Sequence, residues 1–334
     1  MQDSYRKENE TEENNRISRY TVIDKLGKGG SGKVLLVRDT NTKQYYAMKI
    51  IHDIEVAERE AEILRMVDYA GIPKLHDYFT LKRNAYLVME YVKGRTLEEL
   101  NRDEGERNVR IRIAVKIAEI LSYLHTLPTP VIHGDLKPEN IIISEQGEVK
   151  LIDFGSAHLL TKTPEKIHST IGCAAPEMMN GKSGLQGDVY AFGMIFARIM
   201  TGKDLDFTGK DKAFLMRMGL NYSEASIVER CLNAKERKRY PSGKEVLGEL
   251  LKCDRKERFR ARLEGLMCFM CTDIGGILAL YGLLSYFIMG YYKGKYFLSS
   301  GCLLLLIHLI GTSADRVAGV KEFKVTSSVF LADR

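Results

Sequence analysis

The chain has 334 residues, and 50 lysines and arginines against 44 aspartates and glutamates give a net charge of +6 at pH 7. That excess is too small for the densely basic surface of a dedicated nucleic-acid-binding protein, so we expect no nucleic-acid partner. A hydrophobic content of 45% and only 7 prolines exclude wholesale disorder, collagen-like repeats and mucin-like stalks.

The N-terminal part of the chain is predicted to be rich in strands. Residues 1–18 are polar and mixed in charge, and we expect a flexible tail because they have almost no large apolar side chains to bury. Beyond this tail, short runs rich in β-branched and aromatic residues predict strands. An amphipathic helix is expected at residues 55–67. The predicted strands cover residues 20–26, 33–39 and 44–51, and a further strand pair after the helix ends in the run at 85–92.

From Thr96 onward, helical patterns dominate. Residues 111–127 have an apolar stripe at helical spacing, which predicts a helix with one buried face. Residues 188–202 are apolar nearly all round, which is typical of a helix at the centre of a folded lobe. The sequence therefore predicts a β-rich lobe followed by an α-rich lobe.

A glycine-rich loop, GKGGSG, lies between the first two predicted strands, with glycines at positions 27, 29, 30 and 32. The spacing alone is a weak signal, because dinucleotide-binding folds use it at the start of a helix. Here a strand follows at once, so the loop joins two antiparallel strands and its backbone can approach phosphates closely. Lys49, on the third predicted strand, could pair with phosphate oxygens.

Further motifs follow in order along the chain: YAMK, HGDLKPEN at residues 133–140, LIDFG at 151–155, APE at 175–177 and DVYAFG at 188–193. From about Tyr20 to Leu251 the sequence resembles the eukaryotic-type (Hanks-type) serine/threonine protein kinase family. The resemblance implies an α+β, two-lobed kinase fold, with an N-lobe at about 19–94 and a C-lobe at about 95–251. It also implies ATP and Mg²⁺ as cofactors, and proteins with serine or threonine hydroxyls as substrates.

The resemblance assigns roles residue by residue. Transfer of a γ-phosphoryl group mainly needs the protein to position groups and to stabilise charge, and oxygen ligands suit Mg²⁺. Glu60 is chosen as the partner of Lys49 over Glu55, Glu58 and Glu62, because the apolar residues Ile63 and Leu64 follow it. The implied catalytic residues are Asp135, Lys137, Lys49 and Glu60. The implied metal ligands are Asn140 and Asp153. The implied nucleotide contacts are Gly27, Gly29, Gly30, Gly32, Val34, Ala47, Lys49, Met89, Glu90, Val92, Asn140 and Asp153.

The catalytic loop departs from the family pattern, because HGD lacks the arginine that in many relatives binds a phosphorylated activation loop. We therefore expect that phosphorylation of Thr161, Thr163, Ser169 or Thr170 is not required for activity. The resemblance also implies scaffold roles for a Glu177–Arg239 ion pair and for Asp188, as a buried carboxylate that braces the catalytic loop.

Two other functions remain open on the sequence alone. HGD is also similar to small-molecule phosphotransferases of the aminoglycoside type, although the KPEN and APE segments favour a protein substrate. A membrane-bound pseudokinase scaffold is the second alternative. It would predict the loss of Lys49, Asp135, Asn140 or Asp153, and all four are present.

The C-terminal fifth of the sequence is strongly apolar. Residues 274–292 and 296–312 are uncharged, and 19 residues of helix reach about 28 Å, close to the thickness of a bilayer core. We expect two transmembrane helices within 264–312, although a buried helical hairpin is the alternative. The basic segment 252–263 is expected to contact membrane lipid, keeping the kinase domain and the 313–334 tail in the cytoplasm. The resemblance then suggests a membrane-anchored bacterial kinase.

Overall fold

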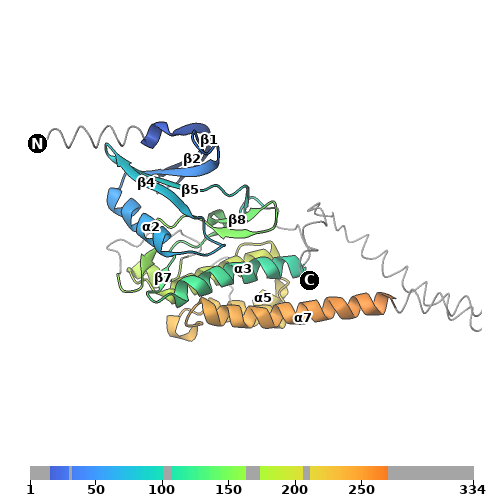
Figure 1. Cartoon of the computed structure of the whole chain (residues 1–334). Helices are drawn as coiled ribbons and strands as arrows, with labels where there is room; N and C mark the ends of the chain where they lie inside the picture. The colour runs from blue at the N-terminus through green and yellow to red at the C-terminus, as the bar shows by residue number, and fades with distance from the viewer. Residues whose placement is uncertain (1–15, 30–31, 101–106, 163–173, 206–210, 270–334) are drawn as a thin grey trace, which may run out of the picture. The chain divides into compact units, whose positions relative to one another are not determined.

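The computed structural model describes residues 16–29, 32–100, 107–162, 174–205 and 211–269 (Figure 1). These residues fall into a compact unit that ends at Leu251 and a second unit that begins at Lys252. The first unit contains a β-rich lobe followed by an α-rich lobe, as the sequence predicts. The expected spans at 274–292 and 296–312, and the 313–334 tail, lie outside the described residues.

The N-terminal lobe is built on an antiparallel sheet in the order β1-β2-β3-β5-β4. Alternating residues of its strands point to opposite faces, and one face carries a core that includes Leu35, Val37, Met48 and Val88. The five strands are β1 (Tyr20–Gly29), β2 (Gly32–Asp39), β3 (Tyr45–Ile51), β4 (Leu75–Leu81) and β5 (Asn84–Glu90).

Helix α2 (Ile54–Met66) is the only long helix described in this lobe, and it contacts β4 and β5. The carboxylate of Asp53 caps its first turn by accepting hydrogen bonds from the backbone N–H groups of Glu55 and Val56. Its buried face includes Ile63 and Leu64, as predicted, and Glu60 lies on the same face. The apolar side chains thus bring a carboxylate into the interior.

The C-terminal lobe is organised around α4 (Leu185–Thr201), whose residues are almost all buried, as the sequence predicts. Helix α3 (Arg107–Thr126) and helix α6 (Tyr222–Cys231) both pack on it. Gly193 permits the close approach of α6, because a Cβ atom there would lie 2.6 Å from the Cβ of Cys231. The short helical elements of this lobe include η1 (Pro138–Asn140), η2 (Met178–Asn180), α5 (Lys212–Arg217) and η3 (Glu236–Lys238).

Short strands on either side of α3 in the chain carry the loops with the HGD and DFG motifs. Strands β7 and β10 pair with each other, and β6, β8 and β9 form a separate sheet. These strands place the two motifs side by side, because β8 and β9 form a hairpin between them. Their bounds are β6 (Gly94–Thr96), β7 (Val131–Ile132), β8 (Ile141–Ser144), β9 (Val149–Leu151) and β10 (His158–Leu159).

The last described element is α7 (Gly243–Phe269), orange in Figure 1. It runs through the basic segment 252–263 without a break, so that segment is helical. Within the described part of the chain, no helix combines the length and the apolar character needed to span a membrane.

Candidate active site

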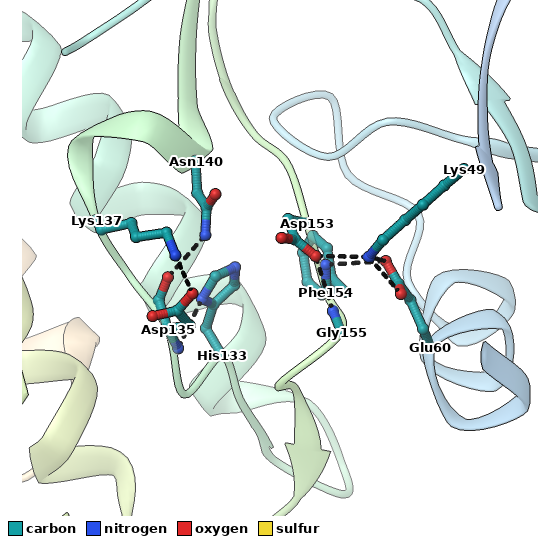
Figure 2. A network of polar contacts seen from close by, with 9 residues as sticks. All are labelled: Lys49, Glu60, His133, Asp135, Lys137, Asn140, Asp153, Phe154 and Gly155. Atoms are coloured by element: carbon teal, nitrogen blue, oxygen red, sulfur yellow. Dashed lines mark hydrogen bonds and ion pairs between the residues drawn. The ribbon is translucent and has the colours of Figure 1, made fainter. Parts of the chain in front are cut away.

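A buried ion pair joins β3 to α2. The ammonium of Lys49 donates to both carboxylate oxygens of Glu60 at 2.7 Å, and the two side chains are at most 5% exposed. Lys49 also donates to Asp153 at 2.6 Å (Figure 2). Burial alone would lower the pKa of Lys49, but the charges of Glu60 and Asp153 outweigh it and raise the pKa. Lys49 is therefore held as a cation beside two carboxylates.

The DFG segment is held in a strained turn. Asp153 has φ of 67°, a conformation that is uncommon outside glycine. Its carboxylate accepts a hydrogen bond from the backbone N–H of Gly155 at 3.2 Å, and the N–H of Phe154 donates to Glu60 at 3.2 Å. Burial would raise the pKa of Asp153, but Lys49 outweighs it and lowers the pKa. Asp153 is thus ionised and fixed at the end of β9.

The HGDLKPEN loop places three predicted residues together. The ammonium of Lys137 donates to the carboxylate of Asp135 at 2.5 Å, and the side-chain amide of Asn140 donates to the backbone carbonyl of Asp135 at 2.9 Å. Both side chains contact Asp135, as Figure 2 shows. Asp135 and Lys137 are only partly buried, so an incoming molecule can reach them.

Asp188, on α4, accepts hydrogen bonds from the backbone of this loop. One carboxylate oxygen accepts the backbone N–H of His133 at 2.8 Å, and the other accepts that of Gly134 at 2.9 Å. His125 lies 3.1 Å from the same carboxylate. Gly134 has φ of 79°, and a Cβ there would lie 2.9 Å from the carbonyl oxygen of Ser156. Glycine is therefore favoured at position 134 for two reasons: its φ is positive, and a Cβ atom would lie too close to the backbone of Ser156.

Four of the predicted nucleotide contacts share one face of the N-terminal sheet. In the strand register, Val34 is opposite Lys49, and Ala47 is opposite Met89. Directly paired residues point to the same face, so these four lie on the side opposite the core that contains Leu35 and its neighbours. The register, which depends on pairing across three strands, brings them together.

The glycine loop is partly described. Gly29 pairs with Gly32 at the end of the β1–β2 hairpin, and Gly30 lies outside the described residues. Gly32 has φ of 143°, and a Cβ there would lie 2.1 Å from the carbonyl oxygen of Ile50. A Cβ at Gly27 would meet nothing within 4 Å. Gly32 is therefore required by the packing of β2 on β3, whereas Gly27 leaves open space.

Glu90, at the end of β5, is predicted to contact a nucleotide base through its backbone. Its backbone N–H donates to the carbonyl of Lys74 at 2.9 Å, so only its carbonyl oxygen could meet a purine base. Its carboxylate accepts a hydrogen bond from the ammonium of Lys150 on β9 at 2.6 Å. Val92, two residues beyond, is half-buried. The Glu90–Lys150 ion pair connects the two lobes and has no counterpart in the sequence analysis.

The predicted metal ligands of the site are Asn140 and Asp153. Among the described residues, there is no group of three or more His, Cys, Asp or Glu side chains that could hold a metal ion by themselves. An amide oxygen and a carboxylate nevertheless suit Mg²⁺, which commonly binds one or two protein ligands together with substrate phosphates. The two residues fit a metal that arrives with a nucleotide.

Comparison with known proteins agrees with this geometry. A family model for the protein kinase domain matches residues 20–264. The chain belongs to the protein kinase family. It is 34% identical over 218 residues to human and mouse ribosomal protein S6 kinase alpha-3. The aligned segment covers 60% of this chain and 29% of each relative. It is 32% identical to ribosomal protein S6 kinase 2 beta of Xenopus laevis, covering 34% of that protein. The chain thus spans about a third of these relatives' length.

The family match confirms the assignment to the protein kinases, and the relatives that the chain resembles are kinases by name. The expected scaffold contact in the C-lobe of the kinase is also present, because Arg239 donates to both carboxylate oxygens of Glu177 at 2.5 and 2.8 Å. The predicted catalytic and metal-binding residues gather in two groups, one that joins Lys49, Glu60 and Asp153 and one around Asp135. The roles assigned to them stay predictions.

Sequence reasoning missed two contacts at the candidate site. Phe154 is buried and packs edge-on against His133, with ring centroids 5.1 Å apart. The ammonium of Lys150 pairs with the carboxylate of Glu90. Both contacts join residues that are distant in sequence, so no local pattern signals them.

Proposed function

We propose that the chain is a membrane-tethered serine/threonine protein kinase that transfers the γ-phosphoryl group of ATP to protein hydroxyls in a Mg²⁺-dependent reaction. The observation that carries the catalytic part is the joined network of Lys49, Glu60 and Asp153, within a domain that matches the kinase family over residues 20–264. The same domain holds Asp135 and Lys137 in contact.

In this proposal, an acceptor hydroxyl binds beside Asp135. The hydroxyl oxygen forms a bond to the γ-phosphorus while the bond from that phosphorus to the β–γ bridging oxygen breaks, and ADP leaves. Asp135 accepts the hydroxyl proton, and Lys137 balances charge on the transferred group. Lys49 holds phosphate oxygens, and Glu60 orients Lys49. A Mg²⁺ ion bound with the nucleotide by Asn140 and Asp153 would neutralise phosphate charge.

The two alternative functions make different demands on the site. A pseudokinase scaffold needs no intact network, yet the cation Lys49 is paired with Glu60 and Asp153. A small-molecule phosphotransferase has no need of the APE segment, whose Glu177 is tied to Arg239. Both observations support a protein kinase that is catalytically competent.

Incubation with γ-labelled ATP tests the reaction. The purified full chain in detergent should label serine or threonine residues of protein acceptors when Mg²⁺ is present, and chelation of the metal should stop the labelling. A panel of aminoglycosides serves as the competing acceptors. Label on an aminoglycoside alone would favour the small-molecule phosphotransferase, and no label on any acceptor would favour the pseudokinase.

The membrane tether is supported by the two uncharged runs at 274–292 and 296–312. The basic residues at 252–262 favour a cytoplasmic kinase domain and contact with lipid headgroups, and two spans would return residues 313–334 to the cytoplasm. A tether of this kind would raise the effective concentration of substrates at the membrane.

Membrane fractionation checks the tether. The full chain should stay in the membrane pellet after an alkaline carbonate wash and should need detergent for release. A chain truncated after Leu251 should appear in the soluble fraction and still bind ATP, since the described compact unit ends at that residue. A full chain that appears in the soluble fraction would contradict the tether without affecting the proposed phosphoryl transfer.

A further inference from the structure

One side of α7 presents basic and aromatic residues to solvent. Lys252, Arg255, Lys256, Phe259 and Arg262 are all exposed, and Phe259 is 65% exposed. Cys253 and Asp254, which point in other directions from the same turns, are buried. The exposed set is therefore a face of the helix, which we call the basic face.

Helix geometry defines the shape of this face. Successive residues of an α-helix are about 100° apart and rise about 1.5 Å, so these five residues fall within an arc of about 120° along about 15 Å of helix. Phe259 lies near the middle of the arc, with basic residues before and after it in sequence. The face thus combines four cations with a central aromatic ring.

Phe259 has the largest exposed fraction among the large apolar residues that the structure describes, and it lies among the four cations. Because apolar surface in water is unfavourable, a ring at the centre of a cationic face favours a partner with both anionic and apolar parts. Helices that carry lysine and arginine together with an aromatic side chain lie in the interface of anionic bilayers, where the cations meet headgroups and the ring enters the acyl boundary. Both components of the basic face fit that environment.

The position of the face in the chain favours lipid over other polyanions. The uncharged run that begins at Ile274 starts only 12 positions after Arg262. A bilayer that receives this run lies within reach of the basic face. The net charge of +6 for the whole chain does not suggest a broader nucleic-acid surface.

We propose that the basic face of α7 lies along the surface of an anionic phospholipid bilayer, with Phe259 inserted among the lipids. This inference rests on the proposed membrane tether and adds a dependence on lipid charge. Anionic headgroups hold the basic face against the bilayer, whereas a neutral surface leaves it in water. The fraction of anionic lipid in the membrane then determines whether the basic face of α7 lies on the bilayer surface.

A single tryptophan at position 259 tests the proposal, because the natural chain has no tryptophan. The full-length Phe259→Trp variant is reconstituted into phosphatidylcholine vesicles, or into vesicles that also contain phosphatidylglycerol, with lipids brominated on the acyl chain as quenchers. We expect a blue-shifted, quenched emission in the anionic vesicles and an unquenched emission in the neutral ones. Equal emission in both would overturn the proposal.

Two further variants make the result specific. Adding Lys256→Glu and Arg262→Glu to Phe259→Trp should return the anionic-vesicle signal to the neutral-vesicle level, because the attraction to headgroups is removed. Tyr222→Trp, at a residue that is 64% exposed on α6, should show no quenching in either vesicle. Quenching that survives both charge reversals, or that excess duplex DNA abolishes by competition, would also overturn the proposal.

The same samples separate this inference from the tether. Flotation of the vesicles on a density gradient reports whether the chain is membrane-bound, independently of the tryptophan. A chain that fails to float with either vesicle would contradict the tether and this inference with it. A chain that floats with both vesicles, but whose tryptophan emission ignores lipid charge, would leave the tether standing and overturn the role of the basic face alone.

Discussion

Replacement of Asp135 by asparagine is expected to lower phosphoryl transfer to protein by about 100-fold to 10,000-fold while leaving ATP binding intact. The amide cannot accept the hydroxyl proton, and it removes the negative charge that faces Lys137 at 2.5 Å. The nucleotide contacts depend on Lys49 and the N-terminal sheet, which this change does not touch. Labelled-phosphate transfer and displacement of a fluorescent ATP analogue would measure the two properties separately.

A matched exchange at Asp68 serves as the control. Its carboxylate is 84% exposed and pairs with Lys74 at 3.2 Å on the surface, so Asp68→Asn should change neither property. Undiminished transfer by the Asp135→Asn chain would remove Asp135 as the catalytic carboxylate. Parallel losses of transfer and of ATP affinity would point instead to a collapse of the site.

The sequence was sufficient to predict whether a residue is buried where burial depends on the local pattern of apolar residues. Glu60 could be chosen among four glutamates because Ile63 and Leu64 mark the buried face of α2, and the structure buries all three. The length and apolar character of the central helix α4 were likewise visible as a pattern. Local periodicity determines which side of a helix is buried, and that is enough to orient a neighbouring carboxylate.

Contacts between distant segments could not be predicted in the same way. The Glu90–Lys150 ion pair depends on how the end of β5 meets β9, and a chain with 50 basic and 44 acidic residues offers many equivalent pairings. Gly32 is predicted to contact phosphate, and the structure adds a second reason for glycine there, which is the carbonyl oxygen of Ile50 on β3. Such contacts follow from strand register and lobe packing, which no short segment encodes.

Replacement of Asp188 by asparagine is expected to destabilise the kinase domain by about 3–5 kcal/mol, the usual cost of removing one partner from a buried charged network. The carboxylate is 2% exposed and accepts the N–H groups of His133 and Gly134 on its two oxygens. An amide has one acceptor oxygen, so one of these buried N–H groups would face a donor. A fall in Tm of roughly 6–20 °C should be visible by differential scanning fluorimetry of the full chain in detergent.

The pH dependence of the stability lost in Asp188→Asn tests whether the loss comes from the charge of the Asp188 carboxylate. Burial alone would raise the pKa of Asp188, but hydrogen bonds from His125 and from the backbone of Gly134 outweigh it and lower the pKa. Because the folded pKa lies below the unfolded one, the stabilisation is fully present above the ordinary aspartate pKa and is lost as pH falls through the depressed folded value. The difference in unfolding free energy between the natural chain and the Asp188→Asn variant should therefore stay constant near neutral pH and decrease only in acid.

Asp204→Asn is the control for Asp188→Asn. The carboxylate of Asp204 pairs with Arg198 at 2.9 Å but is 55% exposed. An exposed pair contributes about 0–1 kcal/mol, so the variant should unfold within a few degrees of the natural chain. A similarly small effect at Asp188 would mean that the backbone of His133 and Gly134 holds its conformation without the carboxylate. The catalytic loop would then owe its geometry to Gly134, whose φ of 79° needs no side-chain brace.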